Sequence, residues 1–224
     1  MRTLPGKRLA GIALTGSLLL AAPGQACETA LALAVDVSGS ISPTEYRLQM
    51  DGIADALLDP TVADAVLGSR VALLLVQWSG SSRQAVVMPW RQPATLAELS
   101  AIAGEVRGIP RTWRHFSTAI GEALDFTAAQ FADAPPCNRH VIDVSGDGFS
   151  NEGTEPAGTR DRLVAQGLTI NGLPIETSVK GLTDYFELMV IGGPGSFAIT
   201  ARNYRDYPRA IRRKLLNELT KPSS

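Results

Sequence analysis

The sequence predicts an α/β protein in which helices cover a mostly parallel sheet. Residues 31–35 form an unbroken apolar run with turn residues directly behind it, which is typical of a strand buried on both faces. Further short apolar runs alternate with segments of helical spacing along the rest of the chain. This alternation is typical of parallel strands joined by crossover helices.

The first 26 residues have the composition of an export signal. Arg2, Lys7 and Arg8 precede an apolar stretch, and small residues at 24–26 offer a cleavage site. The apolar stretch is shorter than a membrane span, and no second run of spanning length follows. We therefore expect a signal peptide over 1–26 and a periplasmic or secreted domain over 27–224, without a transmembrane segment.

The exported part has the size and charge of an ordinary globular domain. Without the first 26 of the 224 residues, 198 remain, with 18 Lys and Arg against 22 Asp and Glu and a formal charge of −4. A chain of this length can bury a full core. A weakly acidic balance gives no support to a nucleic-acid partner.

The first half of the chain predicts three strands and two helices. Ser42-Pro43-Thr44-Glu45 combines an N-cap, a proline at the first helical position and a capping box, and Asp59-Pro60 ends the segment that it opens. A second apolar strand at 71–78 turns through Gly80 into an antiparallel partner at 85–90, and 96–106 has helical spacing.

The second half predicts three more strands and four helices. A loop rich in arginine and aromatic residues covers 107–117. The helices are expected at 118–131, 159–166, 184–188 and 207–219. The strands are expected at 141–145, 168–175 and 189–191.

One carboxylate and two hydroxyls follow the first strand at alternate positions. Asp36, Ser38 and Ser40 lie in the turn at its C-terminal end, where ligands bind in open α/β sheets. Oxygen donors without sulfur or imidazole suit a hard cation such as Mg²⁺. The same side chains also suit a simpler role, with both serines capping the next helix and the aspartate holding the turn.

Together with two later motifs, this stretch resembles the von Willebrand factor type A (vWA) domain with its metal-ion-dependent adhesion site. Asp36, Ser38 and Ser40 match the first part of that signature in full. Thr118 opens Thr-Ala-Ile-Gly-Glu-Ala-Leu, which is similar to the second part, and Asp147 stands where the third part has its aspartate. Gly146 replaces the threonine usual before that Asp-Gly pair. The pattern is most similar to an exported bacterial vWA-like subfamily of unknown function.

The resemblance implies a fold and a set of ligands. The fold is a three-layer sandwich with a doubly wound, mostly parallel six-stranded sheet in the order 3-2-1-4-5-6, whose third strand is antiparallel. In the site, Ser38, Ser40 and Thr118 would coordinate Mg²⁺ by their hydroxyls, and Asp36 and Asp147 would act partly through water. Mn²⁺ and Ca²⁺ remain open as alternatives.

The resemblance also implies a mode of binding. Neutral hydroxyl ligands leave a divalent ion with excess charge and an open position, which an exposed Asp or Glu of a protein partner would complete. We expect a rim for this partner at Arg111, Trp113, Arg114 and His115, which precede Thr118. A solvated basic loop is the alternative for these four residues, and a solvated loop is our expectation for Asn151 and Glu152.

Two other classes of function stay open at this point. A metal-assisted hydrolase would use the ion as a Lewis acid, but no nucleophile elbow and no general base beside the ion are evident in the sequence. A structural envelope protein could carry the metal site without using it. The prediction that we adopt is a binding module that is not an enzyme.

The sheet order implied by the resemblance also predicts a disulfide. Cys27 lies nine residues before Asp36, and Cys137 lies ten before Asp147. If the first and fourth strands are parallel neighbours, the two cysteines are level at the edge opposite the aspartates, and strands about 4.8 Å apart suit a disulfide. An exported protein meets the oxidising conditions that such a bond needs.

Overall fold

A computed structural model of the chain describes residues 27–177 and 179–220. The predicted signal peptide at 1–26 lies outside these described residues. No helix in the two described ranges is both long and apolar enough to cross a membrane.

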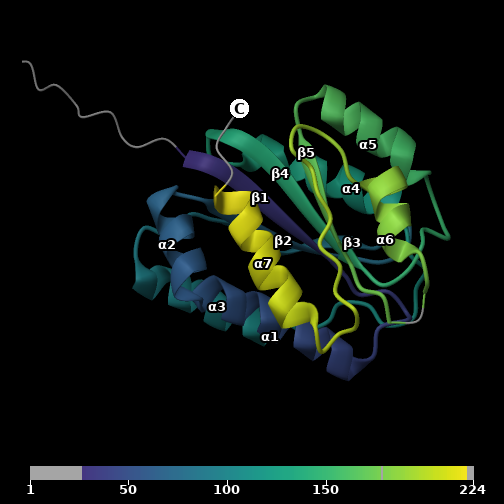
Figure 1. The fold of residues 1–224 in the computed structure, drawn as a ribbon, viewed down its shortest axis with the longest axis horizontal. Coiled ribbons are helices and arrows are strands. Elements are labelled where there is room, and N and C mark those ends of the chain that lie inside the picture. Colours follow the sequence, from purple (N-terminus) through teal and green to yellow (C-terminus); the bar gives the residue numbers. More distant parts are fainter. Residues whose placement is uncertain (1–26, 178, 221–224) are drawn as a thin grey trace, which may run out of the picture.

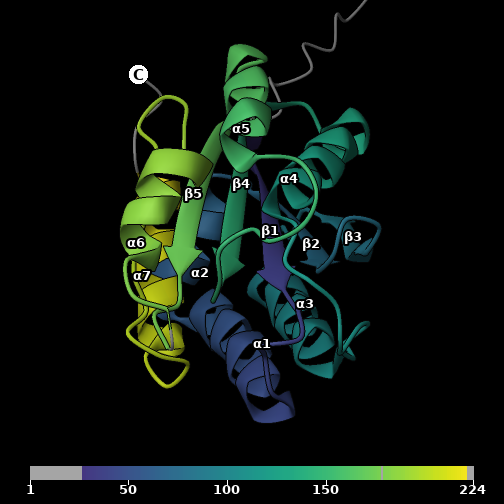
Figure 2. The same ribbon diagram turned by 90° about the vertical axis from the view of Figure 1, so that its right-hand side faces the viewer.

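A five-stranded mixed sheet forms the middle layer, in the order β3-β2-β1-β4-β5 (Figure 2). β2, β1, β4 and β5 run parallel to one another, and the edge strand β3 is antiparallel to β2. The strands are β1 (Cys27–Asp36), β2 (Ala72–Trp78), β3 (Gln84–Arg91), β4 (Cys137–Gly146) and β5 (Thr169–Pro174). The expected order is therefore confirmed for the first five strands.

Helices cover both faces of this sheet, which gives three layers (Figure 1). One face carries α1 (Pro43–Leu58), α2 (Pro60–Gly68), α3 (Leu96–Gly108) and α7 (Tyr207–Thr220). The other carries α4 (Ile120–Ala129), α5 (Pro156–Ala165) and α6 (Leu182–Tyr185). Two short helices complete the chain, the 3₁₀-helix η1 (Gln130–Asp133) and the π-helix η2 (Phe186–Val190).

The central strand β1 is buried along nearly its whole length, as its apolar run predicts. Leu31 and Leu33 pack with α1, α3 and α7 in the larger core, whereas Ala34 faces the second core beneath α4 and α5. Apolar contacts on both faces hold the strand firmly in the middle of the molecule. Its C-terminal end is therefore a rigid place for a site.

The start of α1 has the predicted capping box. The Glu45 amide donates to Ser42 Oγ at 3.2 Å, and the Ser42 amide donates to Glu45 Oε2 at 2.8 Å. Both bonds satisfy amides that the first turn of a helix leaves without partners. The helix consequently begins at a defined residue, immediately after the loop that holds Ser38 and Ser40.

The helix α2 was not predicted. Asp59-Pro60 ends α1 but also begins α2, because Asp59 Oδ1 accepts from the amides of Thr61 and Val62 and Pro60 occupies the first helical position. The same two residues thus serve as stop and start signals.

The expected sixth strand at 189–191 is wrong. In its place η2 buries Phe186 and Val190, four residues apart, and exposes Glu187 and Leu188. This segment packs closely on β5, since a Cβ at Gly172 would lie 2.7 Å from the Phe186 ring. Isolated bridges from Gly192, Ala198 and Ala201 line the edge of β5 instead.

The structure joins Cys27 and Cys137 in a disulfide, in agreement with the predicted pairing. The two residues are direct partners in the β1–β4 register, with Cα atoms 4.4 Å apart. The same register places Val35 beside Ser145, so the ends of both strands reach the opposite edge together.

Candidate functional site

The Asp36 carboxylate is the centre of the candidate site. Asp36 is the last residue of β1 and is fully buried. Its Oδ1 accepts from the Ser38 amide at 2.7 Å, which shapes the turn, whereas its Oδ2 is buried with no partner among the described residues. Burial, and after it the charge of Asp147, raise the pKa of Asp36 to about 7.

Ser38, Ser40 and Asp147 lie together beside this carboxylate. Ser38 Oγ and Ser40 Oγ are 3.3 Å apart, and Ser40 Oγ donates to Asp147 Oδ1 at 2.6 Å. The last contact spans 107 residues of sequence. It exists because β1 and β4 are neighbours whose C-terminal ends meet at one edge of the sheet.

Thr118 lines the same cleft as Ser40 and Asp147, a hollow of about 360 Å³. Asn151 holds its main chain from both sides. The Thr118 amide donates to Asn151 Oδ1 at 2.9 Å, and the Asn151 amide donates back to the Thr118 carbonyl at 2.9 Å. Asn151 also lines the cleft. The expectation of a merely solvated loop is therefore wrong for Asn151, which positions Thr118.

The rim predicted from the sequence divides into two parts. Arg111 is half-buried, and its guanidinium donates to three carbonyls of the loop after β1 (residues 37–41): those of Val37 at 3.0 Å, Ser38 at 2.7 Å and Ile41 at 2.6 Å. We therefore assign Arg111 to the scaffold of this loop, since its donors are already used.

The rest of the rim lies farther out. Trp113 is half-buried against the larger core, while Arg114 and His115 are exposed. The loop that carries them rests on the loop of residues 37–41, because the Gly39 amide donates to the Phe116 carbonyl at 2.8 Å. A Cβ at Gly39 would lie 3.3 Å from that carbonyl oxygen, so this close approach suits glycine.

Gly146 is the one departure from the family signature, and its surroundings give a reason for it. A Cβ at this position would lie 3.2 Å from Asp36 Oδ2 and 3.4 Å from the ring of Trp78. Trp78 is fully buried at the end of β2, opposite Asp36 in the register. The glycine thus leaves room for a large side chain beside the carboxylate.

Tyr204 is a residue of this region that the sequence reasoning missed. It is buried, and its hydroxyl makes no hydrogen bond of acceptable geometry with the described residues. Burial, and then the nearby charges of Asp147 and Asp36, hold the pKa of Tyr204 far above its ordinary value. No local pattern marks it, because it precedes α7 and reaches the site only through the fold.

These side chains form a set of oxygen donors suited to a hard cation. Two carboxylates and three hydroxyls provide no sulfur or imidazole, and Asp36 Oδ2 is a buried acceptor to which no described residue donates. Across the part of the chain that the structure describes, no three His, Cys, Asp or Glu side chains gather into a metal-binding group. A cation at this edge would therefore depend on the hydroxyls.

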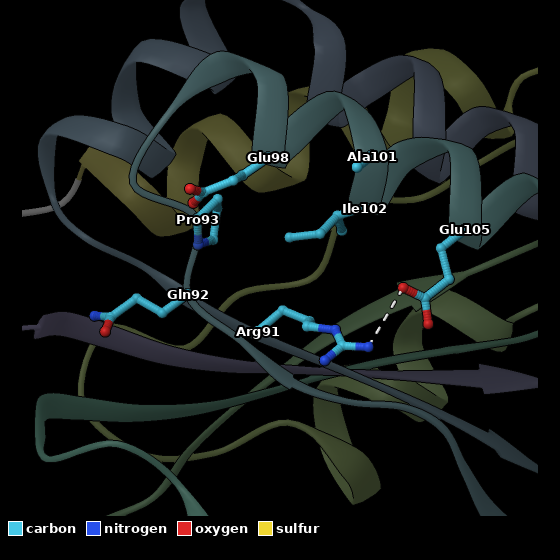
Figure 3. A pocket seen from close by; sticks show the side chains of 7 residues that line it. All are labelled: Arg91, Gln92, Pro93, Glu98, Ala101, Ile102 and Glu105. Carbon is cyan, nitrogen blue, oxygen red and sulfur yellow. Dashed lines mark ion pairs between the residues drawn. The ribbon is translucent and has the colours of Figure 1, made fainter.

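A second cleft, of about 290 Å³, lies between the end of β3 and α3 (Figure 3). Arg91 pairs with Glu105 across it at 3.6 Å, while Glu98 accepts from the Ala94 amide and Gln92 donates to the Arg70 carbonyl. Its polar groups thus serve the local structure. The register of β3 on β2 places this cleft at the edge opposite Asp36.

Comparison with protein families gives one match, which covers nearly the whole described chain. A family described as "Protein of unknown function (DUF1194)" matches residues 26–223. The chain belongs to this family. No curated protein is significantly similar to it in sequence.

Solved structures show that this DUF1194 protein has the vWA fold. One is proximal thread matrix protein 1 (PTMP1) from the mussel byssus, with a TM-score of 0.66 and 17% identity over 87% of this chain and 48% of that one. Another is a von Willebrand factor type A protein from Catenulispora acidiphila, with a TM-score of 0.62 and 15% identity over 88% of this chain and 44% of that one.

A third is the pilus adhesin SpaC from Lactobacillus rhamnosus GG, with a TM-score of 0.61 and 14% identity over 86% of this chain and 30% of that one. The described protein thus spans about half the length of PTMP1 and less of SpaC. One structure of PTMP1 is described as having zinc in its metal-ion-dependent adhesion site. At these identities the likeness shows the fold.

Proposed function

We propose that this protein is an exported binding module that captures an acidic side chain of a partner protein through a bound divalent cation. The observation that carries the proposal is the Asp36 carboxylate. It is fully buried, and one of its oxygens has no partner among the described residues. Asp147, whose charge acts on this carboxylate, lines a cleft together with the hydroxyl-bearing Ser40 and Thr118. A buried carboxylate without a compensating charge is unfavourable, and a cation supplies that charge.

The residues present fit such an ion. Ser38, Ser40 and Thr118 would hold it by their hydroxyls, with Asp36 and Asp147 behind them. The Ser40 hydroxyl already donates its one proton to Asp147, so its oxygen can act only as an acceptor, toward Ser38 or toward a cation. When bound, a divalent cation with mostly neutral ligands supplies an electrophilic open position for a carboxylate.

Mg²⁺ is the cation that we propose, because every donor is an oxygen. Mn²⁺ and Ca²⁺ share this preference, and the zinc in PTMP1 shows that a related fold also accepts that ion in its own site. The neighbouring structures include an adhesin and a matrix protein, which supports a binding function over catalysis.

The cleft beside the donors has an apolar wall. Phe149 is 42% exposed and stacks edge-on against Tyr185, with ring centroids 4.8 Å apart, and Val179 lines the same hollow. A partner carboxylate that reaches the ion would therefore have an apolar surface next to it. Exposed aromatic rings at such positions are typical of protein interfaces.

The direct test is Asp36→Asn, which removes the charge and keeps the shape. We expect calorimetry to show Mg²⁺ binding to the unaltered protein and a loss of at least about tenfold in affinity in this variant, since an ion–carboxylate contact exceeds ~1.4 kcal/mol. Stability in chelator should be retained or higher, because the variant no longer buries a charge.

The matched control is Asp143→Asn, the same change at a buried carboxylate of β4 outside the cleft. It should keep its Mg²⁺ affinity. Equal Mg²⁺ binding by Asp36→Asn and the unaltered protein would refute the assignment of the metal site.

A further inference from the structure

A basic cleft lies next to the loop of residues 37–41, which contains Ser38 and Ser40. Its volume is about 290 Å³, and three guanidinium groups line it, from Arg47, Arg111 and Arg114. The ring of Tyr46 and the side chain of Ile109 form an apolar part of its surface. Within the described part of the chain, no Asp or Glu lines this cleft.

The positive charges in this cleft are only partly balanced. Arg47 pairs with Asp51 at 3.0 Å. Arg111 donates to carbonyl groups, which satisfy its N–H groups but carry no net charge. Burial lowers the pKa of Arg111, the charge of Asp36 raises it, and the charge of Arg114 lowers it further. Arg114 is exposed and lines the same cleft as Arg111, so the two like charges lie near each other. Such a pair attracts an anion.

Arg111 lies between this cleft and the loop of residues 37–41. One edge of its guanidinium donates to the carbonyls of Val37 and Ser38, and the residue also lines the cleft. Ser40 lines the metal cleft and Pro43 lines the basic one. Because Ser40 and Pro43 are three positions apart in the chain, their Cα atoms are at most roughly 11 Å apart. An extended partner peptide of about three residues spans the same distance.

We propose that the basic cleft is a second subsite for the partner, which receives another carboxylate of the same acidic segment whose first carboxylate meets the cation. This inference rests on the proposed function and narrows the partner to a segment with two acidic residues about three positions apart. Arg114 supplies an exposed guanidinium, and Tyr46 and Ile109 receive the apolar stem of the acidic side chain.

Two labelled glycine peptides with blocked ends test this subsite, one with a single glutamate and one with two glutamates three positions apart. Fluorescence polarisation with the full protein in Mg²⁺ should show the second peptide binding about fivefold or more tightly than the first. Arg114→Glu should bring the ratio of the two affinities close to one. Arg213→Glu makes the same charge change on the exposed side of α7 and should leave the ratio unaltered.

Three results would overturn the subsite: equal affinities for the two peptides, equal effects of the two variants, or displacement of the second peptide by submillimolar inorganic phosphate, which would assign the cleft to a phosphoryl group. Failure of both peptides to bind the unaltered protein in Mg²⁺ would overturn the proposed function itself. The two failures can be told apart. If the single-glutamate peptide binds in Mg²⁺ and the second glutamate adds no affinity, the metal site stands and only the subsite is refuted.

Discussion

At the scale of single residues, the vWA-like sequence motifs identify the candidate oxygen donors but not the residues that hold these donors in position. Arg111 gathers three carbonyls of the Asp36 loop, and Asn151 clamps the main chain of Thr118. Both act through hydrogen bonds to backbone groups near the site. A donor that is even slightly misplaced binds its ion poorly, so these supporting residues matter for affinity.

Asn151→Ala tests this support. The change leaves the Thr118 amide without its acceptor and frees the Thr118 hydroxyl to move, so we expect Mg²⁺ affinity to fall about tenfold, within the range seen for residues that orient metal ligands. Calorimetry measures the effect. Asn151→Asp keeps the acceptor oxygen and should not lose affinity; an equal loss in both variants would contradict the positioning role.

At the scale of elements, α7 is fixed to the sheet by a buried ionic cluster. Lys214 Nζ lies 2.6 Å from both Asp143 Oδ1 and Glu218 Oε1, and Asn171 Nδ2 donates to Glu218 at 2.9 Å. All four side chains are buried. Asp143 thereby joins β4 to a helix near the end of the described chain.

This cluster predicts a pH dependence of stability. Two acids face one lysine, so burial, and then the charge of Glu218, raise the pKa of Asp143 to about 7, while Tyr207 lies near the same carboxylate. The folded protein then binds a proton that the unfolded chain releases near pH 4. The free energy of unfolding that this proton adds is fully present below pH 4 and is lost as the pH rises toward 7.

Asp143→Asn removes this titration and leaves Lys214 paired with Glu218. Urea unfolding in chelator at pH 5 and pH 8 should show the unaltered protein losing at least about 1 kcal/mol more than the variant between these values, because one pKa unit corresponds to ~1.4 kcal/mol. Asp36 titrates in both proteins and cancels in the comparison. Parallel pH profiles would show that Asp143 does not titrate in this range.

At the scale of the whole molecule, the disulfide and the candidate site lie at opposite ends of the same pair of strands. Cys27 and Cys137 close a separation of 110 residues. Asp36 lies nine positions after Cys27 along β1, a rise of about 30 Å. The bond should therefore stabilise the fold without acting on the site.

The double change Cys27→Ser and Cys137→Ser tests this separation. We expect the free energy of unfolding to fall by up to about 4–5 kcal/mol, the chain-entropy value for a loop of this length, with Mg²⁺ affinity unchanged. Denaturant unfolding and calorimetry measure the two effects. The unaltered protein under reductant is the control and should match the variant; two alkylatable thiols in the oxidised protein would contradict the bond.

Much of the fold can be predicted from local sequence patterns whose physical basis is known. The apolar run of β1, the capping box at Ser42 and the turn from β2 into β3 each rest on neighbouring residues. The π-helix at 186–190 does not, because a short apolar run suits either a strand or a helix. Contact between Phe186 and Gly172 decides between them.

The sequence by itself determined the five strands, most of the helices and the five candidate oxygen donors, since these depend on residue type and on spacing of a few positions. Only the tertiary structure decided that Arg111 supports the Asp36 loop, that Asn151 holds Thr118, and that Lys214 lies between two acids. Apart from the contact of Lys214 with Glu218 inside α7, these contacts join residues 33 to 74 positions apart. Their energy depends on where the packed sheet brings side chains together, and no local pattern carries that information.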